Sequence, residues 1–221
     1  MAVEIPKSFA DLPTSTPRFI GKAVNRVEDP QLLTGRTEFI DNVTLSGMLH
    51  CAILRSPHAH ARITSIDVSE AQKLQGVVAI VTGEDAKRWS QRITTVPEKW
   101  GAHCLVTDKV RYVGEPVAAV AASSRYVAED ALELINVDYE PLPAVVDATT
   151  AAGPDSPLIF EEHGSNIMLQ RVFTWGDVDA AFGAADQVFT EKFRWNRLGA
   201  NPLETFGVIS QWDIVDRTLT C

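Results

Sequence analysis

The 221-residue sequence contains only three cysteines, Cys51, Cys104 and Cys221. They are odd in number, lie far apart and form no Cys-x-x-Cys pair. A disulfide framework and a structural zinc or iron–sulfur site both need paired or clustered cysteines, so the sequence argues against each of them. We therefore expect reduced thiols and a cytoplasmic protein.

Long apolar runs and runs of basic residues are also lacking. No stretch approaches the ~18 consecutive apolar residues of a membrane span. Residues 1–26 contain no apolar stretch after a basic start, so we expect no ordinary secretory signal. The net charge of −9, without a Lys/Arg run, argues against a nucleic-acid or anionic-membrane partner.

Common catalytic and nucleotide-binding motifs are missing as well. The sequence has no Gly-x-Gly-x-x-Gly, no Walker loop, no Gly-x-Ser-x-Gly and no His-Glu-x-x-His. The five tryptophans are scattered and are most simply packing residues. The residues by themselves therefore identify no convincing active site.

What is present is a mixed α/β (α+β) pattern from Met48 to Val146. Strands are predicted at 48–55, with Leu49, Cys51 and Ile53 on one face, and at 61–68 and 77–83. A short helix is predicted at 69–76, capped by Ser69 and ended by Gly76. Residues 110–122 read as two strand pieces broken at Gly114–Pro116, which places an edge or bend there.

The clearest helix signal is at 123–135, with Ser123 or Ser124 as its cap. A strand follows at 135–143, so the order strand, helix, strand predicts a crossover unit on one sheet. Beyond a Pro-containing loop, Asp177 should cap a short helix, and the alternation at 187–197 is typical of a strand. Two further strands are predicted around a turn at Asp213–Asp216, and the second part of the chain then looks like an unfinished domain.

The densest chemical signal is "SPHAHARI", which contains His58 and His60. On a strand, residues two apart face the same side, so both rings could meet one metal if His50 or His103 joined them. Pro57 precedes the pair, and the next acidic residue is Asp67. We favour a structural or hydrogen-bonding role, with a small His58/His60 metalloprotein as the weaker alternative.

Several carboxylates could act as acid–base groups, but each has a simpler structural interpretation. Asp138 and Glu140 share a strand face and are most simply its solvated side. Glu129 and Asp130 have the same interpretation on a helix, and Glu115 is expected to be a turn residue. Glu204 follows a loop and precedes a strand, where functional groups often lie, but structural hydrogen bonding is the preferred role.

Six stretches, taken in order, resemble the beginning of the large subunit of molybdenum hydroxylases, the xanthine dehydrogenase and aldehyde oxidase family. They are "TGRTEFIDNV", "LHCAILRSPHAHARITSID", "GVVAIVTGED", "VRYVGEPVAAVAA", "AEDALELINVDYEPLPAVVD" and "NPLETFGVI". The carbon monoxide dehydrogenase large-subunit type is the most similar. The resemblance implies an extended arm and lead-in at 1–33 and an a/b hammerhead domain at 34–147. It further implies a linker at 148–165 and an incomplete start of a molybdopterin-binding domain at 166–221.

The resemblance also implies chemistry and partners. Relatives oxidise carbon monoxide, aldehydes or nitrogen heterocycles with oxygen from water. The implied cofactor is molybdenum on molybdopterin cytosine dinucleotide, bound mainly by sequence beyond this chain. The implied partners are the rest of the molybdopterin-binding subunit, an iron–sulfur small subunit carrying 2Fe–2S clusters and a medium subunit carrying FAD.

No catalytic, cofactor-binding or metal-binding residue is assigned within these 221 residues. The family's base glutamate comes late in the large subunit, so Glu204 is too early to match it. The chain alone is therefore expected to be inactive. A non-catalytic assembly or scaffold subunit of such a complex is the alternative function.

Overall fold

The computed structural model describes residues 19–221 except residues 99 and 197. The described chain forms two units, one of residues 45–193 and one that combines residues up to 44 with residues 194–221. Predictions for residues 1–18 lie outside the described part. None of the helices described is long and apolar enough to cross a membrane.

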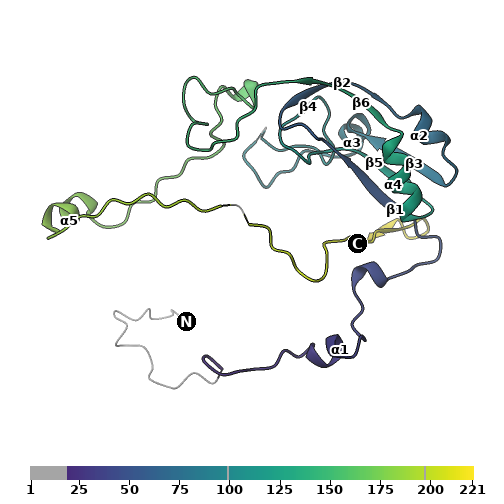
Figure 1. The fold of residues 1–221 in the computed structure, drawn as a ribbon, viewed down its shortest axis with the longest axis horizontal. Helices are drawn as coiled ribbons and strands as arrows, with labels where there is room; N and C mark the ends of the chain where they lie inside the picture. Colours follow the sequence, from purple (N-terminus) through teal and green to yellow (C-terminus); the bar gives the residue numbers. More distant parts are fainter. Residues whose placement is uncertain (1–18, 99, 197) are drawn as a thin grey trace. The chain divides into compact units, whose positions relative to one another are not determined.

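Unit 45–193 contains two antiparallel three-stranded sheets (Figure 1). The first has the order β1-β5-β3 and the second the order β4-β2-β6. The strands are β1 (His50–Arg55), β2 (Ala61–Asp67), β3 (Val77–Thr82), β4 (Lys109–Val110), β5 (Pro116–Ala122) and β6 (Asn136–Pro141). The helices are α2 (Ser69–Lys73), α3 (Gly83–Trp89), α4 (Arg125–Glu133), the 3-10 helix η3 (Glu161–His163) and α5 (Val178–Ala184).

Strand β5 separates the two parts of the core. Ala118 and Val120 face α4 and pack with Ala131 and Ile135. Val117 belongs to the second cluster, with Ala61, Val106 and Val110. Alternate residues of a strand point to opposite faces, so one strand supplies both clusters.

Helix α4 forms where its sequence signals predicted it. The Ser124 side chain accepts a hydrogen bond from the Val127 N–H at 3.2 Å, which caps the helix N-terminus. Ala128 and Ala131 are its buried residues, and their small size lets the helix lie close to the sheet. The mixed α/β prediction is confirmed by these elements.

Several local predictions are wrong. Residues 116–141 make no crossover on one sheet, because β5 and β6 belong to different sheets. Ser69 does not cap α2; it is the first helical residue, and Val68 occupies the cap position. Cys51 and Ile53 do share one face of β1, as predicted; that face is exposed, since α4 covers the opposite face, where Leu54 packs into the core.

Helix α3 was not predicted from the sequence. The Asp85 carboxylate accepts hydrogen bonds from the Thr82 N–H at 2.9 Å and from the Thr82 hydroxyl at 3.1 Å. Gly83 begins the helix, and a Cβ atom built on it would lie 1.8 Å from the Val106 carbonyl oxygen. Only glycine therefore fits between the first turn of α3 and the 106–107 backbone.

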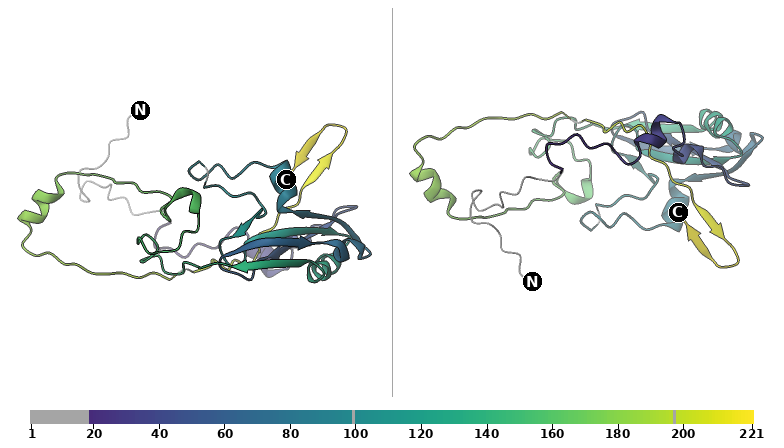
Figure 2. Two further views of the ribbon diagram at one scale, coloured as in Figure 1. Left: turned by 90° about the horizontal axis from the view of Figure 1, so that it is seen from above. Right: turned by 90° about the horizontal axis from the view of Figure 1, so that it is seen from below.

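Residues 167–193 carry α5 on an open loop (Figure 2). The Asp177 carboxylate accepts the Ala180 N–H at 2.9 Å, as the cap prediction required. None of the α5 residues is buried. The prediction of a strand at 187–197 is wrong: the described residues of that range form no strand.

The other unit contains α1 (Asp29–Leu33), the 3-10 helix η2 (Ile40–Asn42) and the hairpin β7 (Gln211–Asp213) with β8 (Thr218–Thr220). The predicted turn is confirmed: the Asp213 carboxylate accepts the N–H groups of Val215 at 2.7 Å and of Asp216 at 3.0 Å. Asp side chains commonly stabilise turns in this way. Those two hydrogen bonds hold the pKa of Asp213 below its usual value.

Replacement of Gly83 tests the tight contact at α3. We expect Gly83→Ala to lower the free energy of unfolding by about 2 kcal/mol, because the new methyl group must push back a backbone carbonyl. Gly183→Ala is the matched control, since Gly183 lies in α5 with nothing within 4 Å of the added carbon. Urea unfolding followed by circular dichroism measures both, and equal stability of the two variants would contradict the expectation.

Candidate functional site

His58 and His60 lie between β1 and β2 and take separate partners. The His58 ring packs against Tyr139 of β6, with centroids 4.8 Å apart. His60 is buried, and its Nδ1 lies 2.6 Å from the Pro143 carbonyl oxygen. Among the described residues, no three His, Cys, Asp or Glu side chains are grouped to hold a metal ion. The geometry of the pair agrees with the structural interpretation.

Ser56 fixes the turn that carries these histidines. Its hydroxyl accepts the His58 N–H at 3.0 Å and donates to the His58 carbonyl at 3.1 Å. The Leu142 N–H donates to the His60 carbonyl at 2.9 Å. The "SPHAH" stretch thus joins the end of β1 to the end of β6.

Glu115 is buried in the turn before β5, as the turn interpretation predicted. Its carboxylate accepts the Arg111 N–H, and its carbonyl accepts the Ser56 N–H at 2.9 Å. Burial raises the pKa of Glu115, and the hydrogen bond from Arg111 opposes part of that rise. No second acid–base group completes a catalytic pair with Glu115 among the contacts described.

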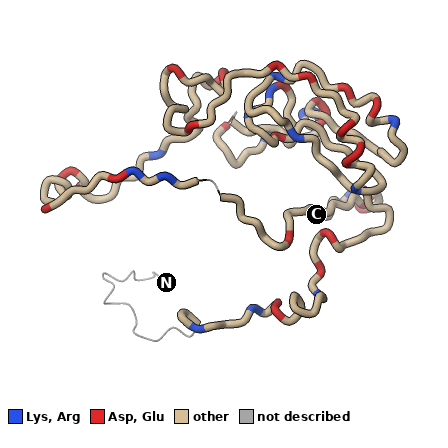
Figure 3. Tube along the Cα trace, viewed as in Figure 1, with Lys and Arg blue, Asp and Glu red and all other residues tan. Residues whose placement is uncertain are grey.

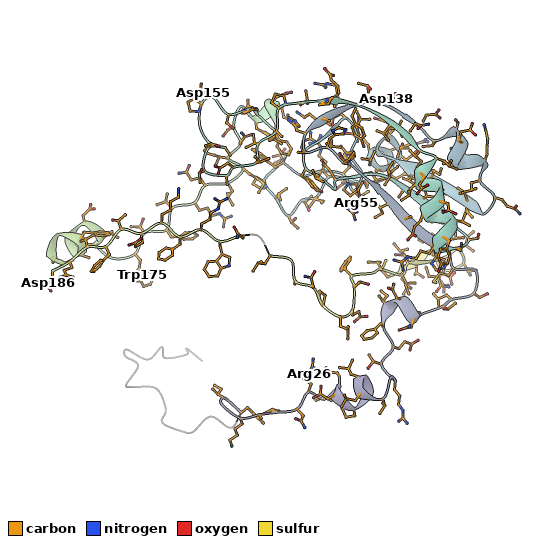
Figure 4. All side chains as sticks on the ribbon, viewed as in Figure 1. Arg26, Arg55, Asp138, Asp155, Trp175 and Asp186 are labelled. Atoms are coloured by element: carbon orange, nitrogen blue, oxygen red, sulfur yellow. The ribbon has the colours of Figure 1, made fainter. Side chains whose placement is uncertain are left out.

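Asp138 and Glu140 interact with β2 beside them. The Ser65 hydroxyl donates to Asp138 at 2.5 Å, and Arg62 lies 3.7 Å from the exposed Glu140 carboxylate. Figure 4 labels Asp138, on β6, and Arg55, the last residue of β1. Glu129 is paired with Arg125 at 3.2 Å on the surface of α4. These carboxylates are therefore exposed and make separate contacts on β6 and α4. Figure 3 shows Asp and Glu residues spread along the chain.

Glu204 makes a long-range contact within the other unit. Its carboxylate accepts the Ile40 N–H at 3.0 Å, at the start of η2. The Thr205 hydroxyl donates to Asp41 at 3.5 Å, and a Cβ on Gly207 would lie 3.0 Å from Ile40 Cγ2. The N–H groups in the first turn of a helix lack intrahelical partners, so Glu204 satisfies one of them.

A second group of contacts was not anticipated from the sequence. Trp100, Phe160 and His163 form an aromatic cluster, with Arg111 over the Phe160 ring at 4.7 Å. The buried Lys109 lies 3.6 Å from the Glu161 carboxylate. Beside this group is a cavity of about 670 Å³, lined by residues 91–94 and 96–98, Gly101 and Glu162. The alternating cations of "DKVRY" and the acidic "FEEH" were the only signals, and they lie about fifty residues apart.

Comparison with protein-family models identifies both parts of the chain. Residues 34–143 match the a/b hammerhead domain of aldehyde oxidase and xanthine dehydrogenase. Residues 159–221 match the molybdopterin cofactor-binding domain. The chain belongs to the xanthine dehydrogenase and aldehyde oxidase family of molybdenum hydroxylases.

Individual relatives agree with the family. The chain is 39% identical over 208 residues to the carbon monoxide dehydrogenase large chain of Afipia carboxidovorans, covering 88% of this chain and 26% of the relative. It is 36% identical over 206 residues to the nicotine 6-hydroxylase large subunit of Paenarthrobacter nicotinovorans, covering 91% of this chain and 25% of that subunit. The chain thus spans about a quarter of the length of these relatives.

A solved structure shows the same fold. Quinoline 2-oxidoreductase from Pseudomonas putida 86 superposes with a TM-score of 0.79 and 39% sequence identity. The superposition covers 90% of this chain and 26% of the other. The fold prediction of a hammerhead domain followed by the beginning of a molybdopterin-binding domain is confirmed.

Glu115 provides a test of pH dependence. The pKa of Glu115 is raised in the folded state, so the folded state binds the proton of this carboxyl more tightly than the unfolded state does. The stability that the protonated group contributes is therefore fully present below the unfolded-state pKa and is lost as pH rises through the folded-state pKa. We expect Glu115→Gln to remove that loss while keeping an acceptor for the Arg111 N–H. Glu133→Gln, on the exposed side of α4, is the control. The test is the free energy of unfolding of each protein, measured as a function of pH across the range in which carboxyl groups titrate. Parallel pH curves for wild type and Glu115→Gln would contradict the expectation.

Glu204 can be tested through the amide that it accepts. We expect Glu204→Ala to speed exchange of the Ile40 amide by roughly fivefold, the equivalent of losing one hydrogen bond of about 1 kcal/mol. Glu204→Gln should retain most of the protection, since its amide oxygen can accept the same hydrogen bond. Exchange monitored by NMR measures this, with the exposed Glu191→Ala as control. Unchanged Ile40 exchange in Glu204→Ala would count against the contact.

Proposed function

We propose that this chain is the first portion of the large subunit of a molybdopterin-dependent hydroxylase or dehydrogenase. The observation that carries the proposal is the order of the two family matches, residues 34–143 and then residues 159–221, within one chain. The whole enzyme would oxidise its substrate with oxygen taken from water. Two electrons would leave the substrate and two protons would be released.

The described residues do not themselves fit a molybdopterin cofactor. From residue 167 to residue 221, Ile209 alone among the described positions is even half-buried. A cofactor of this size needs an enclosed cradle with several polar groups pointing inward. We therefore propose that molybdenum on molybdopterin cytosine dinucleotide is bound mainly by sequence outside this chain, and we derive no reaction step through it.

The proposed partners follow from the same family. They are the rest of the molybdopterin-binding subunit, an iron–sulfur small subunit with 2Fe–2S clusters and an FAD-carrying medium subunit. Large exposed side chains support the need for partners: Phe173, Trp175 and Phe193 are 87%, 94% and 86% exposed. In Figure 4 the Trp175 side chain extends from the loop. Large apolar side chains that remain this exposed are available to pack against a partner.

The proposed substrate class is limited to the compounds that appear in the names of the relatives. The names cover carbon monoxide, nicotine, quinoline and, in one solved structure, an aldehyde. Carbon monoxide, an aldehyde or a nitrogen heterocycle is therefore the proposed substrate. The three free cysteines, all exposed, are consistent with the reducing cytoplasm as its location.

A scaffold function is the second candidate. It is favoured by one observation, the separation of the carboxylates and histidines described above into individual structural contacts. In this case the chain would hold the electron-transfer subunits without taking part in oxidation.

Metal analysis separates the two candidates. We expect the purified chain to contain no molybdenum, because the residues that the structure describes supply no cradle for the cofactor. Coexpression with a relative's remaining large-subunit sequence and its two smaller subunits should give about one molybdenum per complex and oxidation of a substrate of the proposed class. Elemental analysis and dye-reduction assays measure both. Stoichiometric molybdenum in the solitary chain, or a stable coexpressed complex without molybdenum, would overturn the proposal.

A further inference from the structure

The segment Phe160–His163 lies at the beginning of the molybdopterin-binding match, which starts at residue 159. Its contacts are made with residues of the hammerhead match, which ends at residue 143. Both sides of the contact belong to unit 45–193. The two family regions are therefore joined by tertiary contacts as well as by the chain between them.

Aromatic rings make the first part of this contact. The His163 ring stacks on Trp100, with centroids 4.1 Å apart and an interplanar angle of 12°. Phe160 lies 5.0 Å from Trp100 and 5.7 Å from His163, in tilted arrangements. Clustered rings at these separations attract one another beyond the effect of buried area.

Two cations make the second part. The Lys109 side chain is only 4% exposed, and its ammonium group lies 3.6 Å from the Glu161 carboxylate, which is 62% exposed. The Arg111 guanidinium lies 4.7 Å from the Phe160 ring centroid and donates to the Lys109 carbonyl at 2.8 Å. A buried ammonium is costly without an opposite charge, so Lys109 favours a carboxylate at this place.

The incoming segment is itself preorganised. Asn166 accepts the Ile159 N–H at 2.9 Å and donates to the carbonyls of Pro157 at 2.8 Å and Ala151 at 2.9 Å. These hydrogen bonds close the loop 151–166 on itself. A closed loop loses less conformational freedom on docking than an open chain does.

We propose that Trp100, Lys109 and Arg111 form a docking site for Phe160–His163, and that this contact positions the start of the molybdopterin-binding region on the hammerhead domain. The docking site is defined by those three residues. The docking itself is a property of this chain. Its consequence, retention of the cofactor in the assembled enzyme, rests on the proposed function.

Hydrogen exchange on the full chain tests the charged contact. Lys109→Met and Glu161→Gln should each speed exchange of the amides of residues 159–166 by roughly threefold to tenfold, while the amides of β5 stay protected. The double variant should exchange no faster than the faster single variant, because both changes remove one interaction. Glu162→Gln is the matched control, one residue away and without the Lys109 contact.

The aromatic contact is tested in the same way. Trp100→Ala and His163→Ala should speed exchange of residues 159–166 and should show the same lack of additivity. Trp89→Ala is the control, since Trp89 is 67% exposed at the end of α3. Additive effects in either pair, or unchanged exchange in the single variants, would overturn the docking site.

Molybdenum content tests the positioning role. In the coexpressed complex described above, Trp100→Ala and Lys109→Met should reduce molybdenum per large subunit at least threefold, while Trp89→Ala leaves it unchanged. Normal molybdenum content with faster local exchange would overturn the positioning role. Absence of molybdenum from the unsubstituted complex would instead mean that the proposed function fails, and the exchange measurements would still decide the docking.

Discussion

The hammerhead domain depends on covering both faces of strand β5. Ala118 and Val120 are fully buried on the α4 side, and Val117 is fully buried on the side of the second sheet. A strand buried on both faces cannot shift by one residue without exchanging its two sets of contacts. The register of β5 with β1 and β3 is therefore fixed by packing, and the positions of Glu115 and the 111–115 turn follow from it.

The two clusters are linked through β2 and β6. Ile66 and Val137 pack against both of them, so the second sheet contributes to each side of the core. Ile66 and Val137 are also paired across the two strands. The turn that carries His58 and His60 connects β1, which lies beside β5, with β2, which carries Ile66. The turn therefore joins strands of the two sheets whose side chains form the core. The Ser56 and His60 hydrogen bonds are best understood as support for that connection.

Local signals in the sequence predicted most elements but few of their contacts. Ser124, Asp177 and Asp213 each cap or turn the chain through a neighbour two or three residues away, so the sequence alone was sufficient. The buried face of β1 was not predictable, because Leu54 and Ile53 offer an apolar residue to either side and α4 decides between them. Helix α3 was missed because Gly83 disfavours a helix locally, while its actual role is to fit against the distant backbone of Val106.

For the candidate site residues, too, the sequence predicts the kind of role but not the partner. Residue type and position predict structural roles for His60 and Glu204 but not their partners, Pro143 and Ile40, which lie 83 and 164 residues away in sequence. The contacts around Lys109 and Glu161 gave only the charges of two segments about fifty residues apart as a signal, and nothing local indicates that these segments meet. Long-range pairs of this kind need either a structure or covariation to be seen.

In the contact between the two family regions, Lys109 belongs to the hammerhead side. Strand β4 pairs with β2 through Arg62 and Lys109, so the backbone of Lys109 is placed by the hammerhead fold and not by η3. Glu161, by contrast, is largely exposed and keeps most of its hydration when it docks. The buried ammonium of Lys109 needs an opposite charge, and Glu161 supplies it while losing little hydration of its own. Removal of Glu161 would leave Lys109 as an uncompensated buried charge, which costs more than the loss of one partner from a pair of exposed charges.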